Sequence, residues 1–166
     1  MDLGLKDKLI VVTGGGAGIG AGISRACLAE GARVVVLGRP SDNVREFMAE
    51  MKAAGAQCDL VEAHLEDTNR CKEAIAEIEK TYGEIYGLVN NAGVNDGVGL
   101  ASGTVERFLE SLQKNLVHYY ALAHYALPAL KRSRGSIVNI HSVEGLRGYP
   151  GEPVYGSMKA AITRPE

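Results

Sequence analysis

A glycine-rich segment near the N-terminus, Thr13-Gly14-Gly15-Gly16-Ala17-Gly18-Ile19-Gly20, constrains the fold more than any other part of the chain. It follows the apolar run 9–12, which predicts a buried strand, and precedes a helical pattern with Ile19, Ile23, Ala26 and Cys27 on one face. A strand, a glycine turn and a helix in this order are the context of a dinucleotide-binding turn. Without Cβ atoms the backbone can approach a pyrophosphate, and the free N–H groups of the first helical turn can face it. The alternative is a turn that only packs a helix on a strand, and this segment alone favours neither interpretation.

Apolar runs alternate with amphipathic segments along the whole chain. After residues 9–12, further strands are predicted at 33–37, within 58–65, at 85–89 and at 137–140, and a long helical region at about 104–131. Strands that are apolar throughout are typical of a parallel sheet covered on both faces. Right-handed connections then give an α/β, Rossmann-like, doubly wound parallel sheet with strand order 3-2-1-4-5. Ligands of such sheets bind at the carboxyl ends of the strands, here between strands one and four.

Helix boundaries are marked by capping residues. Ser41 is an expected N-cap of the second helix, and Asp67 or Thr68 of the third. Gly55 and Gly83 are expected to end these two helices. The last helix begins at about Pro153.

Composition excludes several classes of function. The 166 residues suit one domain (1–166), with 46% hydrophobic and 23% charged residues and a net charge of −2. This balance predicts neither a nucleic-acid partner nor a membrane-binding patch, and no run has the length of a membrane span or the form of a secretory leader. The three cysteines, Cys27, Cys58 and Cys71, lie in apolar patterns and predict a reduced, cytoplasmic protein without a metal site.

Three residues near the C-terminus could carry chemistry. Tyr155 and Lys159 are four apart on the last helix and share a face, and Ser142 follows strand five. A phenol has a pKa of about 10, and a neighbouring ammonium is expected to lower the pKa of Tyr155. Tyr155 could then exchange a proton with a substrate hydroxyl or carbonyl that Ser142 holds. The alternative is an exposed Tyr–Lys pair on an ordinary amphipathic helix.

The glycine turn, Asn90-Asn91-Ala92-Gly93 after strand four, Ser142, and Tyr155-Gly156-Ser157-Met158-Lys159 together resemble the short-chain dehydrogenase/reductase family. The resemblance implies a nicotinamide nucleotide that carries the hydride. It implies that Ser142 positions the substrate oxygen, that Tyr155 is the acid/base, and that Lys159 binds the nicotinamide ribose and tunes Tyr155. It also implies that Asn115 holds a water in the proton relay. The nucleotide-binding residues that it implies are Gly14, Gly16, Gly18, Ile19, Gly20, Leu65, Asn90, Ala92 and Gly93, together with Tyr155 and Lys159.

A narrower similarity, to bacterial L-fucose dehydrogenases, is carried by residues 90–97 and 118–125. It implies a small polar substrate such as a sugar, for which Asn95 and Asp96 are candidate contacts beside Ser142. An Asn-Asp-Gly turn explains these two residues equally well. A 3-oxoacyl thioester reductase shares every motif and remains an alternative. His118 and His124 do not share a helix face, and both are expected to be packing or surface residues.

The end of strand two bears on the choice of cofactor. An acidic residue there would bind the ribose 2′-hydroxyl of NAD, but Gly38 is followed by Arg39, whose guanidinium suits the 2′-phosphate of NADP. NADP(H) is therefore favoured, with NAD(H) as the alternative. After strand three, His64 stands where an aspartate is common in the family. Either adenine recognition is loosened, or a backbone contact from Leu65 is sufficient for it.

The chain is shorter than the family pattern and is expected to lack the last strands and the substrate lid. Pro165 disfavours helical geometry at Arg164. Strand five is then an uncovered sheet edge. Three outcomes remain open: an active enzyme, a module that binds a dinucleotide without turnover, or an assembly fragment. The family implies a homodimer or homotetramer through the helices of Asn115 and Tyr155.

Overall fold

The computed structural model describes residues 3–162. The predictions for Arg164, Pro165 and the first two residues therefore lie outside the described residues. Five parallel strands form one sheet: β1 (Leu9–Thr13), β2 (Arg33–Gly38), β3 (Cys58–Glu62), β4 (Ile85–Asn90) and β5 (Ser136–Asn139). Their order is β3-β2-β1-β4-β5, which confirms the doubly wound topology predicted from the sequence. The helices are α1 (Gly18–Ala29), α2 (Asp42–Ala53), α3 (Thr68–Tyr82), α4 (Val105–Leu112), α5 (His118–Ser133) and α6 (Pro153–Ile162).

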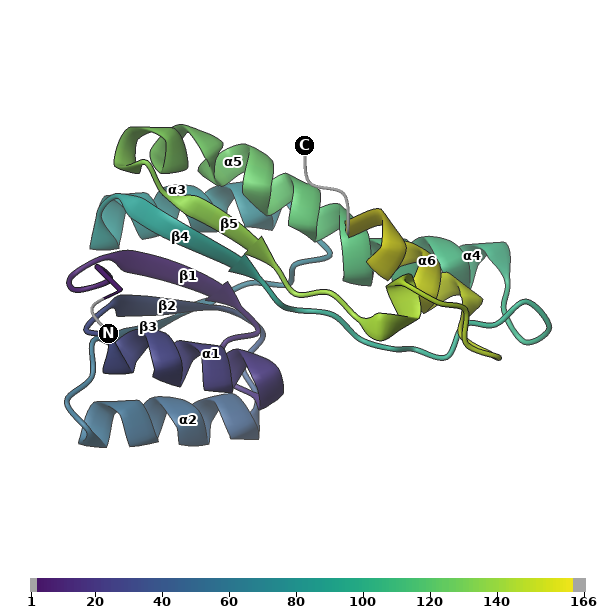
Figure 1. Ribbon diagram of the computed structural model, residues 1–166, viewed down its shortest axis with the longest axis horizontal. Coiled ribbons are helices and arrows are strands. Elements are labelled where there is room, and N and C mark those ends of the chain that lie inside the picture. The colour runs from purple at the N-terminus through teal and green to yellow at the C-terminus, as the bar shows by residue number, and fades with distance from the viewer. Residues whose placement is uncertain (1–2, 163–166) are drawn as a thin grey trace.

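Helices cover both faces of the sheet, α1 and α2 on one side and α3 and α5 on the other (Figure 1). The alternation along β1 feeds both cores: Leu9 and Val11 belong to the core on the α3 and α5 side, and Ile10 and Val12 to the core that contains Phe47 of α2. Because successive side chains of a strand point to opposite faces, a fully apolar strand requires two covered faces. This requirement explains why the apolar runs predicted the fold.

Helix α1 is rotated relative to the sequence prediction, although two of the four predicted residues, Ile23 and Cys27, are half-buried and pack against the core. Ile19 is 68% exposed and Ala26 is also exposed, whereas Gly20, Ala21 and Ser24 are buried. The reason is a close approach at Gly20, where an added Cβ would lie 2.2 Å from the carbonyl oxygen of Gly14. Only a face of small residues can pack this near the turn, so the larger Ile19 is directed away from the core.

The predicted caps are present. The Ser41 hydroxyl accepts a hydrogen bond from the N–H of Val44 at 3.3 Å. Of the two candidates for α3, Asp67 is the cap, and its carboxylate accepts from the N–H groups of Asn69 and Arg70. These bonds satisfy donors that a helix N-terminus otherwise leaves unpaired.

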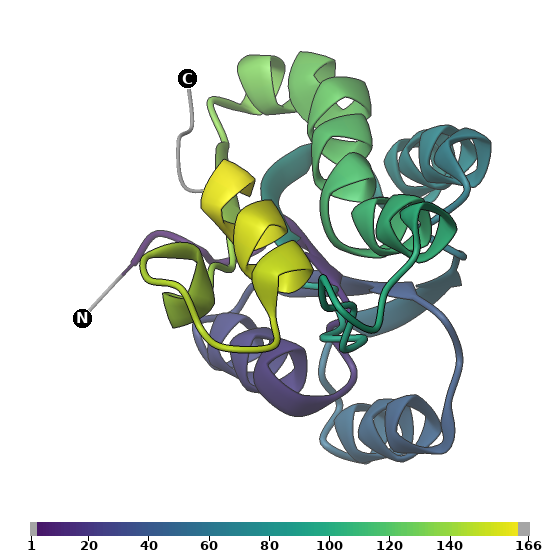
Figure 2. The same cartoon turned by 90° about the vertical axis from the view of Figure 1, so that its right-hand side faces the viewer.

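The long helix predicted at 104–131 is divided by a π-helical turn, η1 (Gln113–Val117), between α4 and α5. Helix α6 packs against this region through Val154 and Met158, which form a small third core with Val98. Figure 2 shows α6 beside the α4 and α5 helices. Within the described residues β5 pairs with β4 alone, and all four of its residues are exposed, as expected for an uncovered edge.

Thr13, at the end of β1, joins β1 to the segment after β4. Its buried hydroxyl donates to the carbonyl oxygen of Val89 at 3.3 Å and accepts from the N–H groups of Asn91 at 2.8 Å and Ala92 at 2.9 Å. The backbone of the Asn91 segment is thereby fixed beside the glycine turn. This side chain therefore holds together the two segments that the sequence predicts to flank a ligand.

Replacing Thr13 with valine should destabilise the protein by about 2–4 kcal/mol, because two N–H groups lose their acceptor without a change in side-chain shape. Urea unfolding measures the loss, and hydrogen exchange at Asn91 and Ala92 should become faster. Thr13→Ser is the matched control: it keeps the hydroxyl and should cost about 1 kcal/mol for the lost methyl group. Equal losses in both variants would contradict the role of the hydroxyl.

Candidate active site

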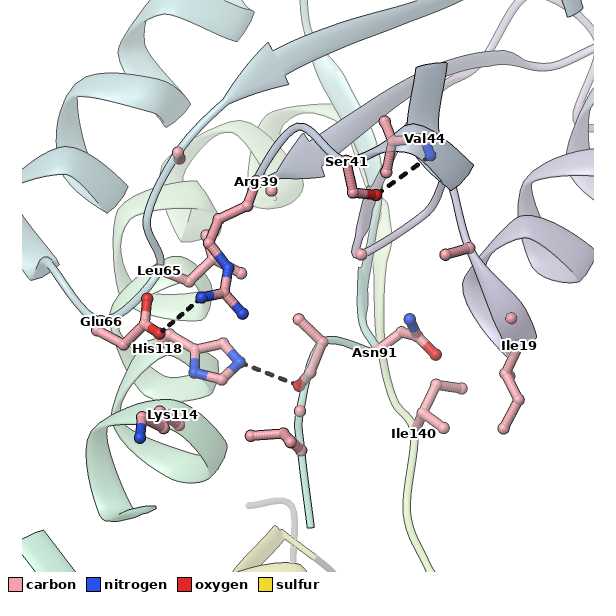
Figure 3. Close-up of a pocket in the computed structure, with 18 of the residues that line it drawn as sticks. Ile19, Arg39, Ser41, Val44, Leu65, Glu66, Asn91, Lys114, His118 and Ile140 are labelled. Atoms are coloured by element: carbon pink, nitrogen blue, oxygen red, sulfur yellow. Dashed lines mark hydrogen bonds and ion pairs between the residues drawn. The ribbon is translucent and has the colours of Figure 1, made fainter. Parts of the chain in front are cut away.

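A cavity of about 780 Å³ lies at the carboxyl ends of the strands. Figure 3 shows it bounded by Ile19 on one side and by Leu65, Glu66 and His118 on the other. The predicted site residues that line it are Gly14, Gly18, Ile19, Arg39, Leu65, Ala92, Gly93, Ser142, Tyr155 and Lys159. The fold thus brings segments from the two ends of the chain to one place.

The glycine turn fits an anionic ligand. Gly14 and Gly18 have φ angles of +62° and +50°, which residues with a Cβ adopt only at a cost. A Cβ on Gly14 would lie 3.3 Å from Nδ2 of Asn91 and 3.4 Å from the Cα of Ala92, so the turn packs directly against the segment after β4. Helix α1 begins at Gly18 with no side-chain cap from Ala17, and Gly18 and Ile19 line the cavity. A helix N-terminus of this kind is suited to bind a phosphate.

The other two predicted glycines do not line the cavity. Gly16 faces α2, where an added Cβ would lie 3.0 Å from Val44. Gly20 packs against Gly14. Both residues shape the turn from behind it.

Arg39 lines the cavity beside an acidic residue, Glu66, that was not among the predicted site residues. Its guanidinium Nη1 is 3.9 Å from Oε1 of Glu66, and both residues line the cavity (Figure 3). Arg39 is 63% exposed, so the pairing is weak and can be exchanged for another anion. The contact between Glu66 and Arg39 could not be predicted from the sequence, because it depends on the pairing of β2 with β3.

His118 is buried in the same wall, in agreement with its prediction as a packing residue. Its ring nitrogens lie 3.2 Å from the carbonyl oxygens of Gln113 and Ala92. Burial lowers the pKa of His118, the two carbonyls act in the opposite direction, and Lys159 lowers it again. The ring joins the π-helical turn to the segment after β4.

Asn90 and Asn115 lie behind the cavity and do not line it. The amide of Asn90 donates to the carbonyl oxygen of Tyr119 at 3.3 Å and to the side chain of Asn139 at 3.0 Å. Asn115 accepts from the N–H of Val94 at 2.8 Å, and its amide nitrogen donates to Ser111. These side chains hold the segment that follows β4 in place.

Asn95 and Asp96, the candidate substrate contacts, lie in a turn beyond the cavity lining. Asn95 accepts from the N–H of Gly97 at 3.2 Å, which is the local bond of an Asn-containing turn. The carboxylate of Asp96 accepts from the Ser111 hydroxyl at 3.0 Å. Their side chains are engaged within the protein.

Ser142, Tyr155 and Lys159 meet at one end of the cavity. The Lys159 ammonium is buried and donates to the Tyr119 hydroxyl at 3.0 Å and to the Ile140 carbonyl oxygen at 3.1 Å. It lies 5.8 Å from the centre of the Tyr155 ring. Burial lowers the pKa of Lys159.

The expected lowering of the Tyr155 pKa is wrong for the described structure. Burial raises the pKa of Tyr155, the carboxylates of Glu144 and Glu152 raise it further, and the Ser142 hydroxyl lowers it. Burial of the phenol, two nearby carboxylates and an ammonium that donates to other oxygens explain the difference. Neither acidic residue belongs to the motif, so the motif alone could not reveal them.

The remaining residues of interest agree with a structural role. Cys71 is buried and Cys27 and Cys58 are half-buried, and burial raises the pKa of the Cys58 and Cys71 thiols to about 11, so they stay protonated at neutral pH. Between residues 3 and 162 there is no group of three or more metal-binding side chains. Over the same range, every helix is too short or too polar to span a bilayer.

Comparison with known proteins agrees with this geometry. The family model of the short chain dehydrogenases matches residues 8–164. A 3beta-hydroxysteroid dehydrogenase of Mediterraneibacter gnavus is 32% identical over 95% of this chain, and an L-fucose dehydrogenase of Bos taurus is 35% identical over 94%. The chain spans 57% of the length of each of these relatives.

A solved structure shows the same fold. The F189W actinorhodin polyketide ketoreductase with NADPH has a TM-score of 0.87 and 30% identity, with 94% of this chain and 61% of that chain covered. The strand order, the glycine turn and the cavity at the ends of β1 and β4 are thus accompanied by similarity along nearly the whole sequence. The chain belongs to the short-chain dehydrogenase family of oxidoreductases.

Proposed function

We propose that the protein is an NAD(P)-dependent oxidoreductase that transfers a hydride between the nicotinamide and a hydroxyl or carbonyl group of a small substrate. The observation that carries the proposal is the meeting of Ser142, Tyr155 and Lys159 with the glycine turn in one cavity. The volume of the cavity lies within the range that is usual for small-molecule and cofactor sites. Since the chain spans just over half of the length of these two relatives, the proposal concerns the protein that contains this chain.

The residues have separate roles in this proposal. The turn at Gly14 and Gly18 holds the phosphates, and Lys159 holds the ribose near the reacting carbon. When bound, the nicotinamide supplies or accepts the hydride. Tyr155 gives a proton to, or takes one from, the substrate oxygen, and Ser142 holds that oxygen by a hydrogen bond. Asn115 fixes the backbone at Val94 and, in the family's manner, supports the proton relay.

Replacing Tyr155 with phenylalanine should lower turnover by roughly 100- to 10,000-fold, the contribution of a positioned acid/base group. Binding of the nucleotide should change little, because the ring remains in the cavity wall. Turnover is followed by nicotinamide absorbance and binding by nucleotide fluorescence. Wild-type-like turnover in this variant would remove Tyr155 from the mechanism. If the unsubstituted protein itself binds the nucleotide without turnover, the binding module is favoured instead.

NADP(H) is the proposed cofactor, with NAD(H) as the alternative. Arg39 supports this choice because it lines the cavity at the end of β2 and no acidic residue of β2 follows Leu37. A guanidinium pairs well with a phosphate and stacks on a planar base. Glu66 opposes the choice in part, since its carboxylate already pairs with Arg39.

Arg39→Ala should weaken NADPH binding by about tenfold and NADH binding much less, because only NADPH carries the 2′-phosphate. Fluorescence titration with both nucleotides measures this ratio. Arg45→Ala is the matched control: Arg45 is exposed on α2 and pairs with Asp42, outside the cavity lining. An equal loss for the two nucleotides would show that Arg39 does not read the phosphate.

A small polar hydroxyl compound such as the sugar L-fucose is the proposed substrate, with a 3-oxoacyl thioester as the second candidate. The similarity to an L-fucose dehydrogenase favours the first, and that to a polyketide ketoreductase the second. Under this proposal Asn95 and Asp96 contact the substrate after their turn rearranges. The free cysteines further support a reduced, cytoplasmic setting.

We further propose a homodimer or homotetramer built on the helices that carry Asn115 and Tyr155. Exposed apolar side chains on the first of these regions support it: Leu109 of α4 is 52% exposed, and Tyr120 and Leu127 of α5 are 75% and 40% exposed. Tyr120 and Leu127 are seven apart and share a helix face. A contiguous apolar surface on this face would favour association with a second copy of the chain.

Tyr120→Glu should shift the protein to a lower oligomeric state, because a charge on this face would have to be desolvated on association. Analytical ultracentrifugation measures the state, and circular dichroism confirms the fold. Lys52→Glu on α2 is a charge-changing control outside the proposed face. An unchanged assembly in Tyr120→Glu would place the interface elsewhere.

A further inference from the structure

Glu144 lies next to the proposed reacting groups and is not part of the motif. It belongs to the short turn η2 (Val143–Gly145), which connects β5 to the loop before α6. The Ser142 hydroxyl donates a hydrogen bond to its carboxylate oxygen Oε2. Both side chains are half-buried, so the bond is partly shielded from water.

The position of Glu144 is fixed by close packing of η2 on α6. A Cβ on Gly156 would lie 2.9 Å from the carbonyl oxygen of Glu144, and one on Gly145 would lie 2.7 Å from the backbone of α6 at Ala160. Two glycines thus allow the turn to contact the helix that carries Tyr155. This arrangement holds the Glu144 carboxylate near the Tyr155 phenol.

A serine hydroxyl has one proton and two lone pairs. If Ser142 gives its proton to Glu144, it cannot donate to the oxygen of Tyr155 and presents only lone pairs there. The charged form of Tyr155 then loses a donor, while its protonated form keeps an acceptor. The direction of the Ser142 hydroxyl is therefore coupled to the state of Tyr155.

We propose that Glu144 is a positioning residue of the active site, which competes with the Tyr155 oxygen for the proton of the Ser142 hydroxyl and so favours Tyr155 as a proton donor. The inference rests on the proposed function, because it assigns Ser142 and Tyr155 to the reaction. It goes further by predicting that the protein favours proton donation to a carbonyl, which is the reductive direction, at neutral pH. A ligand that draws the Ser142 proton from Glu144 releases this restraint.

Other charged groups also face Tyr155. Burial raises the pKa of Tyr155 most, followed by Glu144, and Glu152 in the loop before α6 raises it less. A hydrogen bond from the Ser142 hydroxyl lowers this pKa. Lys159 of α6 lies 5.8 Å from the ring, and Tyr119 of α5 binds Lys159 from the other side. Within the described residues Glu152 makes no hydrogen bond with Ser142, and so it supplies a control that changes charge alone.

The test is a pH titration of Tyr155 by NMR of ¹³Cζ-labelled tyrosine, with the resonance identified by its loss in Tyr155→Phe. In Glu144→Gln the titration midpoint should move to lower pH, because the amide carries no charge and accepts the Ser142 proton less strongly than the carboxylate does. The shift should exceed that of Glu152→Gln. No shift, or a shift no larger than the control, overturns the proposal.

A double-mutant cycle with Ser142→Ala separates positioning from charge. The shift caused by Glu144→Gln should become smaller when Ser142 is absent. An equal shift in both backgrounds overturns the positioning role and leaves a charge effect only.

This experiment distinguishes failure of the inference from failure of the proposed function. Because the titration needs no turnover, the expected shift in a protein without activity supports Glu144 and removes the oxidoreductase. In an active protein, the pH profile of oxidation should move with the same sign in Glu144→Gln. Activity with an unchanged profile and midpoint overturns the inference alone.

Discussion

The position of β1 between β2 and β4 determines where this chain can hold a ligand. The chain leaves β1 toward β2 on one side, and returns on the other side at β4, so the segments that follow β1 and β4 diverge. Thr13 bridges these segments with three hydrogen bonds to backbone groups. The glycine turn, the Asn91 segment and the end of β5 all lie at this edge because parallel strands share one carboxyl end.

The fold could be predicted from the sequence because its central strands are uninterrupted apolar runs. A run such as Val34-Val35-Val36 can be buried on both faces only in a covered parallel sheet, and Ser41 and Asp67 mark helix starts by local hydrogen bonds. The rotation of α1 was not predictable in this way. It depends on the distance between Gly20 and the Gly14 carbonyl, which no helical periodicity records.

Part of the candidate site could likewise be predicted from the sequence, and part depends on tertiary packing. The spacing of Tyr155 and Lys159 on one helix indicated that both would reach the cavity with Ser142, and they do. One partner of Lys159 is Tyr119, forty residues earlier on another helix, so the direction of the Lys159 side chain depends on tertiary packing. For the same reason the acidic surroundings that raise the pKa of Tyr155 were not visible in the motif.

Two acidic residues outside the motif, Glu66 and Glu144, contact the groups that the proposed function uses. Glu66 pairs with Arg39, and Glu144 accepts the proton of the Ser142 bond. A ligand that engages Arg39 or Ser142 must exchange these internal contacts for its own, so its affinity is a difference between two interactions. Under the proposed function the motif residues define the class of reaction, and the neighbouring carboxylates are expected to influence which cofactor form and which direction the protein favours.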